Sequence, residues 1–399
     1  METQRDLSFE RVIDFARDLI RIPSPSGGEG EVAARVVEEL ERLDFDEVWT
    51  DAVGNVFGLV RGTGDGPTVM LSSHLDTVDP GDPDAWEYGP YEGVIADGYL
   101  HGRGAMDIKG PLAIQTYAAA AFLDERPIGN LLVGHTVYEE TAGWGMSHLL
   151  AEGEIRPDLV IIGEATNGDI CIGHRGRAEV VVELRGIAGH ASAPERARNP
   201  VELLDQLIPA IRALAERLPT DPRLGASTIV PTTVETTPTS KNVIPDRVRV
   251  YLDWRILPGT TPEEALELVH STIEPRLDLP DGFGLEIRFA TEHQRTYTGL
   301  EEDRRLFTYG FSIEPDHPVV LKAAEIVEEA TGERPAVRPW TFATDGGQTC
   351  GRYGIPTIGY APGEERFAHT SSERLELESA KRVYECYPKL IRGVQEVIG

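Results

Sequence analysis

The apolar positions of the chain alternate between helical and strand-like spacing. Residues 9–20 carry an apolar residue at every third or fourth position, which predicts an amphipathic helix, whereas the apolar run at 68–73 predicts a buried strand. Both patterns recur along the first half. Helices are expected at 9–20, 29–43, 111–125 and from about Trp144, and strands near 46–60, 68–73, 130–138 and 158–163. Helices that alternate with strands predict an α/β layer around a largely parallel sheet.

The pattern changes near residue 176. Strand, helix, strand, strand, helix and strand are expected in turn at 178–189, 199–218, 226–236, 246–257, 261–277 and 282–290. That order is typical of a small ferredoxin-like α+β domain. A helix at 317–330 and a strand near 355–362 then resume the first pattern. We therefore expect one domain formed by residues 1–175 and 293–399, with a second domain, 176–292, inserted into it.

Composition and charge narrow the classes of function. A chain of 399 residues, 40 % of them hydrophobic, is long enough for two domains with buried cores. The net charge of −29 argues against a nucleic-acid partner, because phosphates attract the opposite sign. The sequence shows no charged-then-apolar leader and no apolar run of about 18 residues, so we expect a cytoplasmic protein without a membrane partner. Its three cysteines are too scattered for a thiolate metal site.

Ionisable side chains follow several of the predicted strands. The segment HLDTV places His74 and Asp76 directly after the strand at 68–73. An open α/β sheet gathers its ligands at the carboxyl ends of its strands, so side chains at these positions are candidates for a single site. The other strand ends and turns of this kind present Asp107, the neighbours Glu139 and Glu140, Glu164 and His369.

These residue types suit a metal centre. Zinc and related ions take nitrogen from histidine and oxygen from carboxylates, and two ions about 3.5–4 Å apart can act on one carbonyl when a carboxylate bridges them. One member of the pair Glu139–Glu140 could then ligate while the other takes a proton from water. The Asp76 carboxylate could hold one ring nitrogen of His74. The alternative interpretation of each strand end, taken alone, is a polar strand end with a hydrogen-bonded histidine.

In their order and spacing, the segments HLDTV, GRGAMDIKG, EE, GEAT and AHTSSE resemble the M20 family of co-catalytic zinc hydrolases. That family includes acetylornithine deacetylase, succinyl-diaminopimelate desuccinylase and a carboxypeptidase that releases glutamate. The resemblance covers essentially the whole chain and is closest to the YgeY-like subgroup. It implies that Asp107 bridges two Zn²⁺ ions, with His74 and Glu164 completing one metal site and Glu140 and His369 the other.

The same resemblance implies the remaining catalytic roles. Asp76 would orient His74, and Glu139 would be the general base. Residues 176–292 resemble the family's lid, which also serves for dimerisation, so 1–175 and 293–399 would be the catalytic metal-binding domain. His190, in GIAGHASAPERARNP, matches a lid histidine thought to reach the neighbouring subunit's site and stabilise the oxyanion. Alternatively, His190 is a loop residue that caps the helix from Pro200.

Several residues match family positions that contact substrate. Arginines suit a carboxylate because they bind it in a bidentate way, although each could instead form an exposed ion pair. The segment ATDGGQTCGRYGIP departs from the GTSDA-type segment of desuccinylases, and this departure bears on the identity of the substrate. The predicted substrate-binding residues are Arg175, Arg177, Asn242, Arg255, Thr344, Asp345 and Gly346.

The resemblance thus implies an amidohydrolase of a small N-acyl amino acid or related amine, with an acetyl- or succinyl-like acyl group. A water bridging two metals would attack the amide carbon, with Glu139 moving the proton. The alternatives are a dipeptidase or carboxypeptidase on the same site, a carbamoyl hydrolase, or a metal-binding protein without activity. Zn²⁺ is the expected ion, with Co²⁺ or Mn²⁺ as alternatives. A homodimer formed through the inserted domain is also expected.

Overall fold

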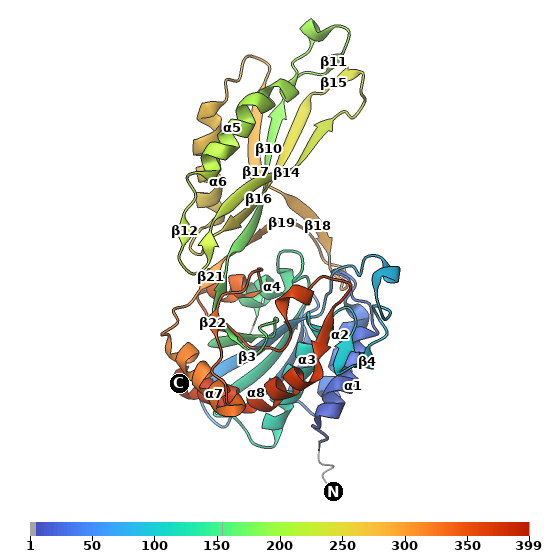
Figure 1. Cartoon of the computed structure of the whole chain (residues 1–399), viewed down its shortest axis with the longest axis vertical. Helices are drawn as coiled ribbons and strands as arrows, with labels where there is room; N and C mark the ends of the chain where they lie inside the picture. The colour runs from blue at the N-terminus through green and yellow to red at the C-terminus, as the bar shows by residue number, and fades with distance from the viewer. Residues whose placement is uncertain (1–4, 154, 399) are drawn as a thin grey trace. The chain divides into compact units, whose positions relative to one another are not determined.

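The structure, a computed structural model, describes residues 5–153 and 155–398, and these form two compact units (Figure 1). The first unit comprises the residues up to His174, His293–Glu302 and the residues from Ser312 onward. The second comprises Arg175–Glu292 and Asp303–Phe311. The described units differ from the predicted domains mainly at Asp303–Phe311, which the prediction assigned to the first domain. Of the described residues, no helix has both the length and the apolar character needed to cross a membrane.

An eight-stranded sheet forms the centre of the first unit. Its central strands β6, β3, β7 and β23 run parallel, while antiparallel pairings join β1 to β2, β2 to β6 and β23 to β8. The predicted mixed α/β layer with a mainly parallel centre is therefore confirmed. In sheet order the strands are β1 (Glu47–Thr50), β2 (Val56–Val60), β6 (Gly129–Thr136), β3 (Gly66–His74), β7 (Leu159–Ile162), β23 (Thr357–Gly359), β8 (Ile170–Cys171) and β22 (Val337–Arg338).

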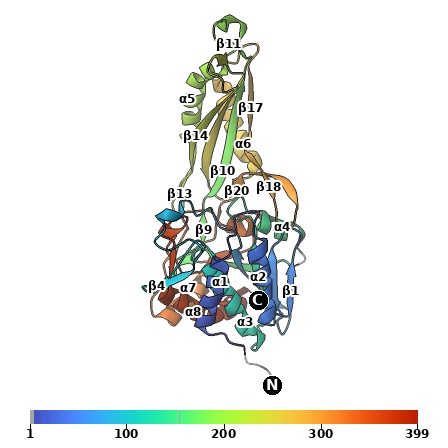
Figure 2. The same cartoon turned by 90° about the vertical axis from the view of Figure 1, so that its right-hand side faces the viewer.

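Helices pack on this sheet and on one another. Helix α3 lies against α1 and α8, as Figure 2 shows, and against the strands β3 and β6. Each of its residues is buried. This explains why its sequence is apolar on all sides rather than along one stripe. The helices of the first unit are α1 (Phe9–Ile20), α2 (Gly30–Arg42), α3 (Lys109–Ala120), α4 (Trp144–Glu152), α7 (Pro318–Thr331) and α8 (Leu377–Ile398). The remaining pieces are a three-stranded sheet of β24 (Arg374–Glu376), β5 (Tyr99–His101) and β4 (Val94–Ala96), and the short helices η1 (Pro83–Ala85), η2 (Ala121–Leu123), η6 (Gly347–Arg352) and η7 (Glu365–Phe367).

Most of these helices begin and end within a few residues of the predicted positions, but α8 was not among the predicted elements. Its apolar side chains, such as Val383, Leu390 and Val394, recur with helical spacing and are buried. That pattern was present in the sequence. The internal Pro388 interrupts a run that otherwise has the spacing of an amphipathic helix.

The second unit is a sheet with two helices packed on it. Its main strands lie in the order β14-β16-β10-β17, all antiparallel, which is the ferredoxin-like arrangement of a β-α-β-β-α-β chain. Alternate residues of β16, from Val248 to Ile256, are buried with the apolar faces of α5 and α6. The main elements are β10 (Gly176–Arg185), α5 (Leu204–Ala215), β14 (Thr228–Thr237), β16 (Arg247–Ile256), α6 (Pro262–Ile273), β17 (Gly284–Phe289) and β20 (Phe307–Thr308).

Short elements complete the description. Within the second unit these are β11 (Gly189–His190), β12 (Thr220–Asp221), β13 (Gly225–Ala226), β15 (Val243–Ile244), η3 (Pro194–Arg196), η4 (Pro200–Leu203) and η5 (Glu274–Arg276). Where the chain passes between units it forms β9 (Gly173–His174), β18 (Thr291–Arg295), β19 (Glu301–Arg305) and β21 (Phe311–Ser312).

Candidate metal centre

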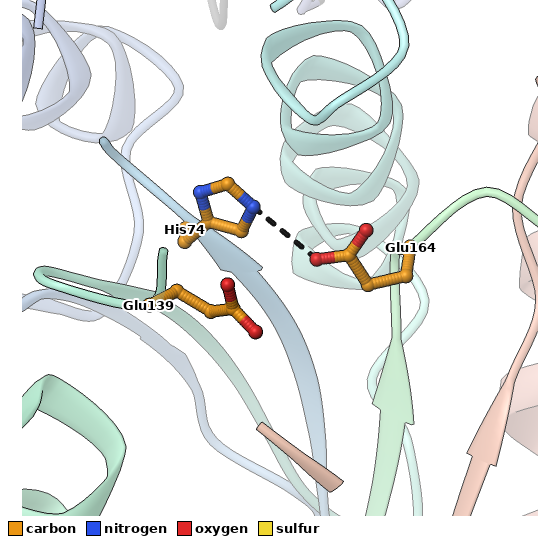
Figure 3. Close-up of side chains that lie close together, drawn as sticks. All are labelled: His74, Glu139 and Glu164. Carbon is orange, nitrogen blue, oxygen red and sulfur yellow. Dashed lines mark ion pairs between the residues drawn. The ribbon is translucent and has the colours of Figure 1, made fainter. Parts of the chain in front are cut away.

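Three adjacent parallel strands bring ionisable side chains to one edge of the central sheet. His74 is the last residue of β3, Glu139 and Glu140 follow the end of β6, and Glu164 lies two residues beyond β7. Figure 3 shows His74, Glu139 and Glu164 facing one another. One potential ligand atom from each of these three lies within 4.8 Å of the others. The edge is the carboxyl end of the parallel strands, where open α/β sheets bind ligands.

Asp107 lies between two histidine–glutamate pairs. Its Oδ1 is 3.2 Å from His74 Nε2, and the same nitrogen is 3.2 Å from Glu164 Oε1. Its Oδ2 is 3.2 Å from His369 Nε2, which is 3.1 Å from Glu140 Oε2. We call the first group, with His74 and Glu164, the His74 half, and the second, with Glu140 and His369, the His369 half. The shared carboxylate has the position that the resemblance implies for a bridging ligand.

The two halves differ in exposure and in backbone support. The His74 side chain is 2 % exposed, whereas that of His369 is 52 % exposed. His369 has a φ of 61°, in the left-handed region that few residues other than glycine adopt. One histidine therefore belongs to a buried strand and the other to an irregular surface loop.

Asp76 contacts both the ring of His74 and the turn that carries the two glutamates. Its backbone carbonyl, not its carboxylate, is the nearest partner of His74 Nδ1, at 2.8 Å, while its Oδ1 lies 3.5 Å away. The carboxylate instead accepts the backbone N–H groups of Glu139 (3.1 Å) and Glu140 (3.2 Å) and the hydroxyl of Ser26 (2.6 Å). Asp76 thus fixes the His74 ring and the turn that carries both glutamates. Ser26, in a Pro/Ser/Gly loop without periodic pattern, was not among the predicted site residues.

The concentration of buried acid shifts the protonation equilibria of these groups. Burial and the neighbouring carboxylates hold the pKa of Glu139 well above its usual value, and burial with Asp107 raises the pKa of Glu164 to about 7. Burial opposes protonation of His74, yet its carboxylate neighbours, led by Asp107, raise its pKa well above the usual value. Hydrogen bonds to Asp107 and Glu140 raise the pKa of His369 to about 10. The cluster therefore favours bound positive charge.

The donor set fits divalent metal ions. Two imidazoles and a group of carboxylates are the ligands that zinc and its neighbours take, and a buried carboxylate cluster needs compensating cations. The buried Glu140 Oε1 has no hydrogen-bond partner among the described residues, so it has a lone pair available to an ion. The metal ligands would be His74, Asp107 and Glu164 in one half and Asp107, Glu140 and His369 in the other.

The segment 344–346 lies in the first unit and is buried. The hydroxyl of Thr344 is 3.0 Å from His174 Nε2 and accepts the N–H of Gly346 at 3.0 Å. Asp345 accepts the Thr136 hydroxyl at 2.9 Å through Oδ2, while its Oδ1 is buried without a partner in the described part of the chain. Of these three predicted substrate residues, only Asp345 retains a polar side-chain atom without a hydrogen bond.

In the second unit, His190 and Asn242 lie close together. Strand β11 pairs with β15, and Asn242, just before β15, accepts the N–H of Ala191 through its backbone carbonyl at 3.1 Å. His190 Nδ1 accepts the N–H of Ser192 at 3.1 Å. Because a backbone N–H can only donate, the neutral His190 ring carries its proton on Nε2.

The predicted substrate arginines have partners within the second unit. Arg177 Nε is 2.8 Å from Asp253 Oδ2, and Arg255 Nε is 2.9 Å from Asp253 Oδ1. Arg175 donates to the carbonyl of Ala226 at 2.8 Å. These contacts match the alternative interpretation of Arg177 and Arg255 as surface ion pairs, and their role in substrate binding stays a prediction.

With the shared carboxylate and the two histidine–glutamate pairs described, the sequence and fold of the chain can be compared with those of known proteins. Residues 70–393 match the family model of peptidase family M20/M25/M40. The chain belongs to this family. The predicted family is therefore confirmed, and with it the prediction of a metal-dependent hydrolase acting on amide bonds.

Several known proteins resemble the chain over most of its length. Protein YgeY of Escherichia coli (strain K12) is 33% identical over 367 residues, covering 90% of this chain and 88% of YgeY. A succinyl-diaminopimelate desuccinylase of Methylorubrum extorquens is 31% identical over 408 residues, covering 94% of this chain and 97% of the desuccinylase. An M20 family metallo-carboxypeptidase, Sso-CP2 of Sulfolobus solfataricus, has a similar fold, with a TM-score of 0.74, 18% identity and coverage of 98% and 100%.

Proposed function

We propose that this chain is a two-metal amidohydrolase that removes an acetyl- or succinyl-like acyl group from an amino acid or a related small amine. The observation that carries the proposal is Asp107, whose two oxygens face two separate histidine–glutamate pairs. Two bound ions, most readily Zn²⁺, would polarise the substrate carbonyl and acidify water at neutral pH. A carboxylate shared in this way is the feature that distinguishes a dinuclear site from a single-ion one.

Glu139 is the general base in this proposal. It takes a proton from the attacking water and returns it to the leaving amine, which requires a carboxylate beside the site but outside both metal pairs. Its side chain faces His74 and Glu164 (Figure 3), while Glu140 is the neighbour that contacts His369. The hydrogen bond from the Glu139 N–H to Asp76 holds its backbone in place.

His190 is proposed to donate to the oxyanion, from the neighbouring subunit of a homodimer formed through the second unit. The support from within that unit is the hydrogen bond from Ser192, which leaves the Nε2 proton of the neutral ring as the donor. Asn242, Arg175, Arg177 and Arg255 are proposed to contact the substrate carboxylate, and Asp345 to face the substrate from the first unit.

The acyl substrate is favoured over a peptide by the relatives. The desuccinylase shares 31% identity over nearly its whole length, whereas the carboxypeptidase resembles this chain at 18% identity, which concerns the fold alone. A dipeptidase or carboxypeptidase remains the alternative on the same residues.

The proposal is tested by offering the Zn²⁺-loaded chain N-acetyl-, N-succinyl- and N-carbamoyl-amino acids and dipeptides in parallel. We expect one acyl class to be cleaved preferentially, with turnover lost in Glu139→Gln. Dipeptide cleavage alone would make the chain a peptidase. Turnover that survives in Glu139→Gln would contradict the assignment of the base.

A further inference from the structure

Glu373 is a buried carboxylate that contacts the backbone of the shared ligand Asp107. Its side chain is fully buried, and its Oε1 accepts the N–H of Met106 at 3.1 Å and the N–H of Asp107 at 3.2 Å. Its Oε2 pairs with Nη1 of Arg103, whose side chain is only 2 % exposed. The carboxylate therefore fixes the backbone immediately at Asp107.

The same residue is connected to the second histidine of the centre. Glu373 follows His369 by four residues in the segment AHTSSE. Its carbonyl accepts the N–H of Gly102 at 3.3 Å, and β24, which begins at the next residue, pairs antiparallel with β5. The loop that carries His369 and the turn that carries Asp107 are thus joined at Glu373.

Arg103 completes this connection. Its guanidinium compensates the charge of the buried Glu373 carboxylate and lies over the Trp86 ring, 5.2 Å from the ring centroid. A buried carboxylate without such a partner would be costly, so the position of Glu373 depends on Arg103. Both residues belong to segments that carry the family resemblance, GRGAMDIKG and AHTSSE, but neither had been given a role.

The other half of the centre has separate support. His74 ends a strand that is paired on both sides, and its ring is held by the carbonyl of Asp76. His369 lies on a loop, in a left-handed backbone conformation, with a half-exposed side chain. Loss of Glu373 would therefore disturb the His369 half more than the His74 half.

We propose that Glu373, held by Arg103, is a positioning residue that sets the separation of Asp107 from His369 and so the metal affinity of the His369 half. The inference rests on the proposed two-metal function. Residues that orient metal ligands from outside the coordination sphere typically change metal affinity about 10–100-fold when substituted.

The experiment measures metal affinity rather than turnover. The full chain and its Glu373→Gln and Glu373→Ala variants are stripped of metal and titrated calorimetrically with Zn²⁺. His369→Ala provides the reference for loss of the His369 half. In Glu373→Ala we expect the Kd of that ion to rise about 10–100-fold, while the Kd of the ion in the His74 half, which shares Asp107 but has its histidine fixed on a strand, rises less. Glu373→Gln, which keeps an acceptor oxygen but loses the charge opposite Arg103, is expected to lie between.

Glu39→Gln is the matched control. Glu39 is also a buried carboxylate, 3 % exposed, and accepts hydrogen bonds from Arg35 (2.9 Å) and Arg42 (2.6 Å) away from the centre. The Glu39→Gln substitution should lower the thermal stability of the chain without changing the Kd of either ion. The inference is overturned if both ions weaken equally in the Glu373 variants, if neither weakens, or if Glu39→Gln has the same effect. If the unsubstituted chain binds fewer than two ions, the proposed function fails first.

Discussion

The His74 half and the His369 half of the candidate metal centre share Asp107 but are held by different kinds of structure. His74 ends a central strand, its side chain is 2 % exposed, and its ring is held by the Asp76 carbonyl. His369 lies on a loop, is 52 % exposed and has a φ of 61°. A strand end needs little further support, whereas a loop ligand depends on contacts such as those of Glu373. The comparison indicates one rigid, buried half and one accessible half.

The largest expected effect concerns Glu139, the residue that the proposed function assigns as general base rather than as a metal ligand. Glu139→Gln should lower kcat by about 10²–10⁴-fold, because the glutamine side chain cannot take a proton from water. Both halves should keep their ions. Steady-state kinetics and metal analysis of the same sample check this. Glu140→Gln is the contrasting variant, in which the His369 half should lose metal. Loss of metal from the His74 half in Glu139→Gln would instead make Glu139 a ligand.

The two histidines should differ in their effect on the metal-free fold. His74→Ala removes the partner of two buried carboxylates, Asp107 and Glu164, and should lower the free energy of unfolding by about 3–5 kcal/mol. His369→Ala, at a half-exposed site, should cost about 0–1 kcal/mol. Denaturant unfolding of both variants without metal measures the difference. Equal losses would contradict the proposed distinction between the halves.

Removal of metal should proceed in two phases. A chelator should extract the ion of the exposed His369 half first, and activity should disappear in that phase because the proposed mechanism would use both ions. The slower phase should coincide with release from the buried His74 half. Parallel assays of bound metal and turnover follow both processes, with Co²⁺ as a spectroscopic substitute. A single phase would indicate that the halves exchange together.

A gradual effect of pH on stability arises from His135, on β6, which leads to the Glu139–Glu140 turn. Burial lowers the pKa of His135 to about 3, so the folded chain keeps it neutral where the unfolded chain, with a pKa near 6.5, binds a proton. The free energy of unfolding should therefore fall as the pH drops below about 6.5, by at most about 1.4 kcal/mol per pH unit, until about pH 3. His135→Gln should remove this contribution to the slope. The pH dependence of the free energy of unfolding that remains is then due to the candidate centre and other titratable groups. An unchanged slope would show that His135 does not cause it.

The sequence alone was sufficient to predict the strongly periodic helices and strands and the residue types of the candidate centre. Helix α1 occupies the predicted residues, and the alternating burial of β16 follows its sequence pattern. Local spacing determines which face of an element is apolar, and this does not depend on the rest of the fold. The polar residues after β3, β6 and β7 could likewise be recognised, because polar groups interrupt apolar runs there.

The pairing of those residues was decided by the tertiary structure. Which histidine faces which glutamate follows from the strand order β6-β3-β7-β23 and from loops far apart in the chain. The register of β10 with β16 places Arg177 opposite Arg255, and both pair with Asp253, a contact that no local pattern encodes. The use of the Asp76 carbonyl on His74 is a matter of atomic distances between two residues just at and beyond the end of β3.

The role proposed for Glu373 could not be predicted from the sequence alone. Its place in AHTSSE was visible in the sequence, but its two hydrogen bonds reach the backbone of residues more than 260 positions earlier. The chemistry of a ligand depends on its residue type, which the sequence specifies directly. Its support depends on distances between segments, and these are set only when the sheet, helices and loops pack together.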